Sequence, residues 1–332
     1  MTRLLLAGAG LIGSRHMCYI LDHPDLVLAG LVEPEADRRT GAEAPAFADL
    51  ASVDVAADGI VIATPTETHA PLTIEAAERG WHVLVEKPLA ETLEAADAMI
   101  EAGRAAGIRI LVGHHRRHHP VVARLKEIVE GGELGRPVTA ALLWTMRKQD
   151  AYFEPAWRGG MNGAPVKQNL IHDIDTLRYL FGEVEDVVGL GANPVRGAAR
   201  TESGGAVLRF ASGLIATVAF ADTTPTPWGF EAGTGESPTI PKTGQNSLRI
   251  AFTKGGVEFP SLTTWSGAAD WSEAPIRADV DCPPAVPLVR QLEHFAEVCA
   301  GAQPIVDAED GRKTLEATLR LEAATLPPGL TL

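Results

Sequence analysis

The chain has 332 residues, 45% of them hydrophobic, and carries a formal net charge of −14. That length is enough for two domains, and the apolar content supports a large core, which excludes a globally disordered chain. The negative charge excludes nucleic acid and anionic membrane surfaces as expected partners, and the apolar runs fall short of the roughly 18 residues that a membrane helix needs.

The N-terminus and the cysteines indicate the compartment. The apolar run after Arg3 is short and breaks into glycines, unlike a signal peptide with its small-residue cleavage site. Cys18, Cys282 and Cys299 are far apart and odd in number, so they offer neither a zinc-binding spacing nor a disulfide framework. This usage suits a reducing compartment, and we expect a cytoplasmic protein.

The chain opens on a strand-turn-helix pattern. The apolar run 4–7 predicts a buried parallel strand, and the spacing Gly8-x-Gly10-x-x-Gly13 follows it directly. In a dinucleotide-binding unit, Gly8 allows the tight turn, Gly10 lets a pyrophosphate approach the backbone, and Gly13 lets the helix pack closely on the strand. The alternative is that these are tight-turn glycines with no nucleotide beside them.

The segments after the glycines support the nucleotide interpretation. A helix expected from Leu11 to about Leu21 would point the N–H groups of its first turn, which contains Leu11 and Ile12, at the phosphates. A second strand at 26–32 is followed by Glu33, whose carboxylate would accept hydrogen bonds from the ribose hydroxyls and repel a 2′-phosphate. We therefore expect NAD rather than NADP. The alternative is a solvated carboxylate at a strand end.

The first third of the chain continues to alternate strand and helix patterns. In chain order, strands and helices are expected at 59–63, 68–79, 82–86, 92–106 and 109–113. Thr92 is the expected cap of its helix and Gly107 the expected stop. This alternation predicts a doubly wound parallel sheet of the Rossmann type, in which ligands bind beyond the carboxyl ends of the strands.

After Pro120 the pattern changes to long strands joined by short turns. Strands are expected at 137–146, 184–190, 206–210, 214–220, 248–252 and 256–259. Helices are expected at 120–130, 170–181, 287–300 and 308–324, and a long ordered loop at 223–245. The pattern predicts an α/β domain with a large, open, mostly antiparallel sheet that has one free face.

We therefore expect an α/β chain of two domains. Residues 1–118 would form an NAD-binding Rossmann domain, and residues 119–332 a substrate-binding and oligomerisation domain whose closing helices can pack back on the first. A free apolar sheet face usually indicates association, so a homodimer or homotetramer is expected.

Strand ends are the first places to look for chemistry. Glu86-Lys87-Pro88 follows the fourth expected strand directly. Pro88 favours an extended Lys87, whose ammonium would point into the cofactor cleft. The alternative is a surface lysine beside a turn proline.

His172-Asp173-Ile174-Asp175 opens the helix at 170–181, whose expected apolar face is formed by Leu170, Ile174, Leu177 and Phe181. His172 and Asp175 are three residues apart and share a helix face. The carboxylate can therefore hold the imidazole in one tautomer and stabilise its charged form. The alternative is a capping and salt-bridge cluster in which Asp175 pairs with Arg178 or Arg117.

Four histidines lie within the six residues His114–His119. A zinc site would need a carboxylate or thiolate nearby and ligands that face inward, whereas adjacent residues here point in different directions, so we expect no metal. Arg116 or Arg117 would instead meet substrate oxygens or a carboxylate in the cleft. We count His115 and Arg117 among the substrate-binding candidates.

Three motifs, in this order and spacing, resemble the Gfo/Idh/MocA family, the group of glucose–fructose oxidoreductase and inositol 2-dehydrogenase. They are Gly8-x-Gly10-x-x-Gly13, Glu86-Lys87-Pro88 and the stretch from Asn169 to Asp175. The resemblance covers essentially the whole chain. Further matches are Thr64-Pro65-Thr66 with His69, Arg117 before His118-His119-Pro120, and Trp157-Arg158.

The resemblance implies roles for these residues. Lys87 and His172 would be the catalytic pair, and Asp175 would belong to the substrate and proton network. The expected cofactor contacts beyond the glycine loop and Glu33 are Thr64, Pro65, Thr66, His69, Glu86, Lys87, Trp157 and Arg158. The expected substrate contacts are Lys87, His115, Arg117, Gln168, Asn169 and His172.

One position departs from the family pattern. Many members carry an aspartate four residues before the histidine, where this chain has Gln168. An amide can hydrogen-bond a hydroxyl but cannot take its proton, which puts more weight on His172 as the base. Lys167, at an apolar position of the motif, is not explained by the sequence.

These observations predict an NAD-dependent dehydrogenase that oxidises a secondary alcohol or hemiacetal carbon of a sugar, polyol or cyclic diol, or performs the reverse reduction. Hydride would leave the carbinol carbon for the nicotinamide, the hydroxyl proton would leave for His172, and Lys87 would stabilise the developing alkoxide. Two alternatives stay open: a glycosidase that uses bound NAD transiently, and a non-catalytic cofactor-sensing protein.

Overall fold

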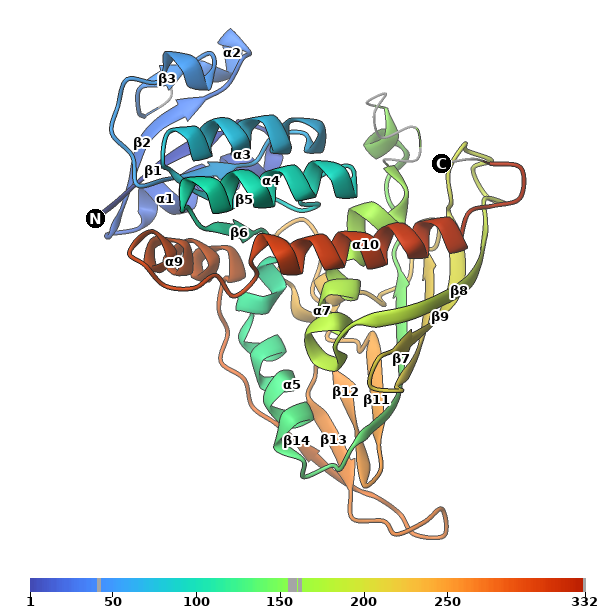
Figure 1. Cartoon of the computed structure of the whole chain (residues 1–332). Coiled ribbons are helices and arrows are strands. Elements are labelled where there is room, and N and C mark those ends of the chain that lie inside the picture. The colour runs from blue at the N-terminus through green and yellow to red at the C-terminus, as the bar shows by residue number, and fades with distance from the viewer. Residues whose placement is uncertain (41–42, 155–159, 161–162, 331–332) are drawn as a thin grey trace. The chain divides into compact units, whose positions relative to one another are not determined.

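The computed structural model describes residues 1–40, 43–154, 160 and 163–330. They form two compact units, which are described separately below (Figure 1). The first unit comprises Met1–His118 and Val286–Leu315, and the second comprises His119–Ala285 and Glu316–Leu332. Among the helices of the described residues, none combines the length and the apolar content needed to cross a membrane.

The first unit is built on a parallel sheet whose strands lie in the order β3-β2-β1-β4-β5-β6. The bounds are β1 Thr2–Ala7, β2 Leu26–Val32, β3 Ala46–Phe47, β4 Gly59–Ile62, β5 His82–Val85 and β6 Ile110–Val112. Neighbouring strands run parallel throughout this order. The doubly wound Rossmann sheet predicted from the strand and helix alternation is therefore confirmed. The two-residue β3 is too short to show a period and was not predicted.

The helices of the first unit follow its strands. Their bounds are α1 Leu11–Asp22, α2 Ala36–Arg39, α3 His69–Glu78, α4 Leu93–Ala106 and α9 Pro287–Cys299. Helix α4 begins and ends as predicted, because Thr92 Oγ1 accepts a hydrogen bond from the Ala95 N–H at 3.2 Å. Gly107 ends the helix with φ +68°, a left-handed conformation that glycine adopts without strain.

The second unit holds an open sheet in the order β14-β13-β12-β11-β7-β10-β9-β8. Its strands are β7 Pro137–Thr145, β8 Val184–Ala192, β9 Ser203–Phe210, β10 Ile215–Ala221, β11 Leu248–Phe252, β12 Gly255–Phe259, β13 Thr263–Ser266 and β14 Ile276–Asp279. Among these described strands, β7 and β10 pair in parallel and the other neighbours pair antiparallel. The prediction of a mostly antiparallel sheet is confirmed, although β13 and β14 were not predicted.

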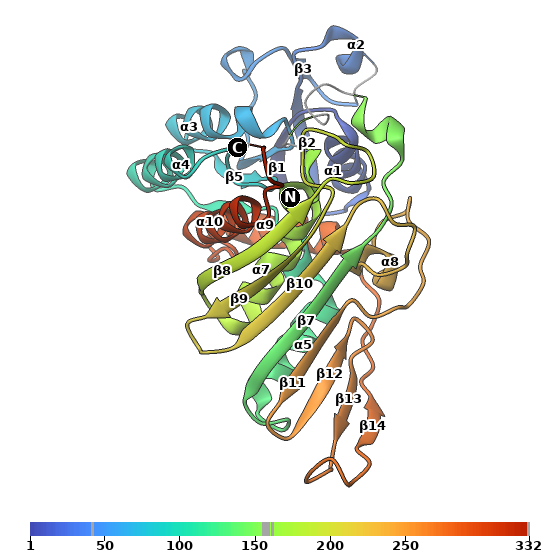
Figure 2. The ribbon, with the colours of Figure 1, turned by 90° about the vertical axis from the view of Figure 1, so that its right-hand side faces the viewer.

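Helices pack on one face of this sheet, and Figure 2 shows the sheet with α5 and α7 behind it. The helical segments are α5 Pro120–Gly131, η4 Asp150–Phe153, η6 Val166–Leu170, α7 Ile171–Phe181 and α8 Phe230–Thr234, joined by the second half of α10 Ala308–Ala324. Side chains alternate along the strands, so Leu208 and Val218 are buried while Val207 and Ile215 are exposed. The free face predicted for the sheet is therefore present. Helix α8 lies within the segment 223–245 that we expected to be loop throughout.

Helix α7 differs from the prediction in two ways. The π-helix η6 precedes it, so His172 lies inside the helical segment and does not open it. The predicted apolar face is buried, with Leu170, Ile174, Leu177 and Phe181 in the core, but the helix also buries Asp173, Asp175 and Arg178, which was not predicted. Polar groups that are buried in this way need partners. Arg178 has one in Glu183, at 2.9 Å.

Candidate active site

The glycine loop has the geometry that the sequence predicts. Gly8 has φ +95°, and a Cβ at this position would lie 2.6 Å from Ala63 O. A Cβ at Gly13 would lie 2.1 Å from Gly8 O, so the helix and the loop approach each other closely only because Gly13 has no side chain. Gly10 caps α1, and a Cβ there would meet nothing within 4 Å. The space beside Gly10 and the N–H groups of α1 together fit a pyrophosphate.

Glu33 is held against this loop at the end of β2. It is 4% exposed, so it is not a solvated strand-end carboxylate. Its Oε2 accepts a hydrogen bond from Ala9 N at 2.8 Å and its Oε1 accepts one from Glu35 N at 3.1 Å. The nearby Arg39 donates to the Glu33 and Pro34 carbonyls. Each carboxylate oxygen keeps a lone pair that can accept a hydrogen bond from a ribose hydroxyl, so these acceptors fit NAD.

The Thr64-Pro65-Thr66 segment follows β4 and leads into α3. Thr68 Oγ1 donates within this turn, to Thr64 Oγ1 at 2.6 Å or to Pro65 O at 2.7 Å. His69 is 1% exposed, and its ring nitrogens face two backbone carbonyls: Nδ1 lies 2.9 Å from Pro88 O and Nε2 lies 3.0 Å from Thr64 O. Burial lowers the pKa of His69, although both carbonyls oppose that shift. The ring joins the carboxyl ends of β4 and β5.

Glu86-Lys87-Pro88 follows β5, and Glu86 is a buried carboxylate. Its Oε1 lies 2.8 Å from His16 Nε2, and its Oε2 accepts a hydrogen bond from Lys87 N at 3.3 Å. Burial alone would raise the pKa of Glu86. The hydrogen bond from His16 and the positive charges of His16, His115 and Lys87 outweigh it and hold the pKa below its usual value. Glu86 therefore stays ionised beside Lys87.

His16 is a functional candidate that the sequence reasoning missed. It is 0% exposed and lies on the buried face of α1, with Gly13 and Ile20 as the other buried residues of that helix. The sequence carries only a partial signal, because a histidine on the apolar face of a helix needs a polar partner but the pattern does not say which residue that partner is.

The segment His114–His119 contains the short helix η3 His115–His118. Arg116 and Arg117 are buried, and Arg117 Nη1 lies 2.6 Å from Asp310 Oδ2 of α10. The expected carboxylate partner of Arg117 is thus a residue of its own unit. His119 caps α5, with its Nδ1 accepting a hydrogen bond from Val121 N at 3.1 Å. Within the described ranges, no group of three or more His, Cys, Asp or Glu side chains is arranged to hold a metal ion.

In the second unit, the candidate residues lie on the helical segment formed by η6 and α7. His172 and Asp175 are 7% and 1% exposed on α7, and Gln168 and Asn169 lie on η6. Tyr152 OH lies 3.5 Å from Gln168 Oε1, at the outer limit of a hydrogen bond. Arg178 and Arg117 form ion pairs with Glu183 and Asp310. The segment η6 that carries Gln168 and Asn169 is a π-helix, and short π-helical stretches occur frequently at functional sites.

The structure explains Lys167, which the sequence did not. Its Nζ lies 2.9 Å from Oε2 of Glu322 on α10, and the Glu322 side chain is 1% exposed. Burial raises the pKa of Glu322, and the adjacent Lys167 only partly opposes that shift. The pair ties the π-helix η6, which carries Gln168 and Asn169, to a helix 155 positions further along the chain.

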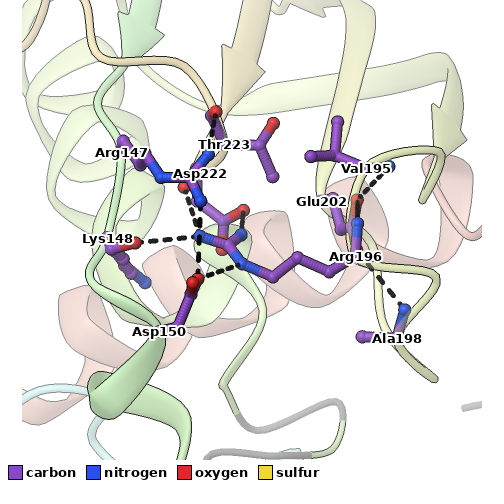
Figure 3. A network of polar contacts seen from close by, with 9 residues as sticks. All are labelled: Arg147, Lys148, Asp150, Val195, Arg196, Ala198, Glu202, Asp222 and Thr223. Carbon is purple, nitrogen blue, oxygen red and sulfur yellow. Dashed lines mark hydrogen bonds and ion pairs between the residues drawn. The ribbon is translucent and has the colours of Figure 1, made fainter.

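A polar network fixes the loops at one end of the open sheet (Figure 3). The Arg196 guanidinium donates to Asp222 Oδ1 at 2.8 Å, to Lys148 O at 2.9 Å and to Asp150 Oδ1 at 3.2 Å. Glu202 is fully buried and accepts hydrogen bonds from the backbone N–H groups of Val195, Arg196 and Ala198. The network joins the ends of β7, β8 and β10 to the start of β9 and supports the η4 turn that carries Tyr152.

Two further candidates, Trp157 and Arg158, lie outside the described residues. The other predicted residues fall into two groups. The glycine loop, Glu33, Thr64–Thr66, His69, Glu86, Lys87, His115 and Arg117 belong to the first unit, and Gln168, Asn169, His172 and Asp175 belong to the second.

The fold and these residues define a class of protein, the Rossmann-type oxidoreductases that pair a dinucleotide-binding unit with a second α/β unit. Residues 2–114 match the family model described as an oxidoreductase family with an NAD-binding Rossmann fold, and residues 122–258 match the model of the GFO/IDH/MocA C-terminal domain. The chain belongs to the GFO/IDH/MocA family. Its first unit is the NAD-binding Rossmann domain of that family, and the resemblance stated from the motifs is confirmed.

Individual relatives agree with this assignment. Inositol 2-dehydrogenase 4 of Saccharopolyspora erythraea is 34% identical over 232 residues, which span 65% of each protein. The 1,5-anhydro-D-fructose reductase of Ensifer adhaerens is 32% identical over 181 residues, 50% of this chain and 53% of the reductase. The matches thus span less than two thirds of these relatives.

Solved structures show the same fold. An oxidoreductase of Agrobacterium radiobacter in complex with NAD+, L-tartaric acid and magnesium has a TM-score of 0.81 to this chain at 16% identity. The similarity covers 97% of this chain and 96% of that one. The similarity in fold therefore extends over both units of this chain.

Proposed function

We propose that the protein is an NAD-dependent dehydrogenase that oxidises a secondary alcohol or hemiacetal carbon of a sugar, polyol or cyclic diol, or performs the reverse reduction. The observation that carries the proposal is Lys87, which follows β5 of an NAD-binding domain beside an ionised, buried Glu86. The named relatives, which act on inositol and an anhydro sugar, support the substrate class.

The chemistry divides among three side chains. NAD, when bound, supplies the hydride acceptor. The Lys87 ammonium donates a hydrogen bond to the carbinol oxygen and stabilises the charge that develops as hydride leaves the carbon. His172 takes the hydroxyl proton as the carbonyl forms, and Gln168 can orient a hydroxyl but cannot accept its proton. Reduction of the carbonyl is the same sequence reversed.

The preference for NAD over NADP rests on Glu33. Its buried carboxylate would repel a 2′-phosphate. The neighbouring arginines are also engaged elsewhere, because Arg38 pairs with Glu35 at 3.1 Å and Arg39 donates to two backbone carbonyls. The surroundings of Glu33 thus favour a free ribose.

The test measures reduction of the nicotinamide by the purified protein through its absorbance. NAD and NADP are assayed in parallel against a panel of sugars, inositols and cyclic diols. We expect NADH with at least one member of the panel. Glycoside cleavage without net NADH would instead indicate the glycosidase alternative, and tight NAD binding without turnover would indicate a sensor. Neither alternative gains support from the two named relatives, a dehydrogenase and a reductase.

We also propose that the free sheet face forms a homo-oligomer. Val188 pairs with Val207, and Val207 with Thr217, on a face where Val188 and Val207 are 67% and 45% exposed. An apolar surface of this kind is usually covered in a stable protein. Val207→Glu should reduce the molar mass measured by light scattering, whereas Val195→Glu, at an exposed valine outside the strands, should not.

A cytoplasmic location fits the chemistry of the cysteines. Cys18, Cys282 and Cys299 are free thiols. Burial raises the pKa of Cys299 to about 12 and also raises that of Cys282, so both stay protonated at neutral pH. Thiols of this kind suit a reducing compartment, where NAD is also available.

A further inference from the structure

The two residues that flank Lys87 are each contacted by a buried histidine. Before it, Glu86 Oε1 lies 2.8 Å from His16 Nε2. After it, Pro88 O lies 2.9 Å from His69 Nδ1. His16 and His69 are 0% and 1% exposed, and they come from the different helices α1 and α3.

The sheet topology explains why these two helices reach the same segment. Helix α1 follows β1 and α3 follows β4, and the order β1-β4-β5 makes these strands neighbours. In a parallel sheet the carboxyl ends of neighbouring strands lie at the same edge. His69 is the first residue of α3 and His16 lies in the middle of α1, and both rings reach the segment that follows β5.

We propose that His16 and His69 form a clamp on the segment Glu86–Pro88 and are positioning residues that hold Lys87 for catalysis. The inference rests on the proposed function, in which Lys87 acts on the substrate oxygen. It gives both histidines a task that the dinucleotide motif does not require.

His16 acts through a carboxylate. A carboxylate only accepts hydrogen bonds, so His16 Nε2 is the donor to Glu86 Oε1. The other oxygen of Glu86 accepts from Lys87 N at 3.3 Å, so one side chain links α1 to the Lys87 backbone. Without His16, the buried carboxylate would lose its side-chain donor and would take up a proton or rotate. Either change alters the charge and the hydrogen bond next to Lys87.

His69 acts through the backbone. Its Nδ1 and Nε2 lie 2.9 Å from Pro88 O and 3.0 Å from Thr64 O, so the ring lies between the ends of β4 and β5. A neutral imidazole has one N–H, and in the tautomer with the proton on Nδ1 it donates to Pro88 O on the other side of Lys87. The residues on either side of Lys87 are therefore both contacted by a histidine, Glu86 by His16 and Pro88 by His69.

The experiment compares His16→Leu, which removes the donor, with His16→Gln, whose amide can restore an N–H near the position of Nε2. We expect His16→Leu to lower kcat by about 10- to 100-fold, since small displacements of a reacting group have effects of this size. NAD affinity should change little, because the glycine loop and Glu33 are intact. His16→Gln should recover most of the loss. Cys18→Ala, an exposed position on the same helix, is the matched control.

Two results would overturn the inference. One is a folded His16→Leu protein with wild-type kcat. The other is equal loss of activity in His16→Leu and His16→Gln, which would show a packing role without need for the donor. If His16→Leu does not fold, His69→Leu and His69→Gln provide the same comparison at the other side of Lys87, with the same expected rescue.

A readout without turnover separates this inference from the proposed function. Reductive methylation with 13C-formaldehyde labels Lys87, and loss of the signal in Lys87→Arg assigns it. The clamp predicts that the Lys87 resonance moves in His16→Leu and returns in His16→Gln, even if the wild-type protein oxidises nothing on the panel. An unmoved resonance in His16→Leu would refute the clamp whatever the activity.

Discussion

Two regions of this protein each place a lysine beside a buried glutamate, and the two glutamates respond in opposite ways. In the first unit, Glu86 has Lys87 next to it, a hydrogen bond from His16 at 2.8 Å and one from Lys87 N at 3.3 Å, and its pKa is lowered. In the second unit, Glu322 has Lys167 at 2.9 Å and its pKa is raised. Among the described residues, Glu322 Oε1 has no hydrogen-bond partner.

The difference shows that burial alone does not decide the charge of a carboxyl group. Burial is the largest single influence on both pKa values and raises each of them. Several donors and cations overcome it at Glu86, whereas one lysine does not at Glu322. A carboxyl group whose pKa is lowered, like Glu86, suits a reaction centre, and the pair Lys167–Glu322 suits a structural link between η6 and α10.

Removal of Lys87 should therefore have the largest effect on the reaction and almost none on the fold. We expect Lys87→Ala to lower kcat by about 10²- to 10⁴-fold, the usual range for loss of a group that acts on the reacting atoms. Its stability should change little, because Glu86 keeps the hydrogen bond from His16. Initial rates of NADH formation and urea unfolding measure the two quantities. Lys313→Ala, an exposed lysine of the same unit, serves as control, and a Lys87→Ala protein with wild-type kcat would contradict the assignment.

Glu33 adds to the comparison a third buried carboxylate, which accepts its hydrogen bonds from the backbone N–H groups of Ala9 and Glu35. Glu33→Ala should weaken NAD binding by about 10- to 100-fold, since hydrogen bonds to a charged group are worth about 1.5–3 kcal/mol. Binding of NADP should weaken less, because the 2′-phosphate is no longer repelled. Titration calorimetry with both nucleotides measures the change. Glu35→Ala removes the neighbouring exposed carboxylate and should leave NAD affinity unchanged.

The same contrast explains how far the sequence predicts the two regions. In the first unit the functional groups lie at the ends of short apolar strands, so the strand pattern by itself locates Gly8–Gly13, Glu33 and Glu86–Pro88. His16 escapes sequence reasoning because its partner Glu86 is 70 positions away in the chain. A pairing at that separation has no local pattern.

In the second unit the supporting contacts are nearly all long-range. Lys167 is explained only by Glu322, and the Arg196 network joins residues as far apart as Lys148 and Asp222. The motif around His172 can be recognised, but the burial of every side of α7 depends on elements that pack around it. The π-helix η6 escapes prediction because an inserted turn has no separate apolar period.

Loss of the second lysine should affect stability more than chemistry. We expect Lys167→Met to lower the free energy of unfolding by about 1–3 kcal/mol, because Glu322 is left buried without its cation. This loss of stability should be smaller than if Glu322 had to stay charged, because its raised pKa lets the buried carboxyl group take up a proton when Lys167 is absent. The double variant Lys167→Met with Glu322→Leu should recover much of it, since an apolar pair often replaces a buried ion pair without cost. Urea unfolding measures both, and an unchanged single variant would show that the pair contributes nothing.

The smallest expected effect is on the pH dependence of the free energy of unfolding. It is also the most specific one, because it has opposite signs for Glu86 and Glu322. Glu322 has a higher pKa in the folded protein than in the unfolded chain, so it favours folding at low pH and loses that contribution as the pH rises through its folded pKa. Glu86 has a lowered pKa, so its contribution is present above the unfolded value of about 4.3 and is lost as the pH falls.

Relative to wild type, Glu322→Gln should therefore gain stability as the pH rises above about 4.3. Glu86→Gln should lose stability relative to wild type in the window below that value, as the pH rises from the lowered pKa of Glu86 to about 4.3. Free energies of unfolding measured in urea at a series of pH values give both curves. The opposite slopes follow from the donor count around each carboxylate, because an amide in place of Glu322 removes a charge that the fold accommodates poorly. An amide in place of Glu86 removes a charge that His16 and Lys87 stabilise. Slopes of the same sign would mean that burial, and not the set of donors, controls both groups.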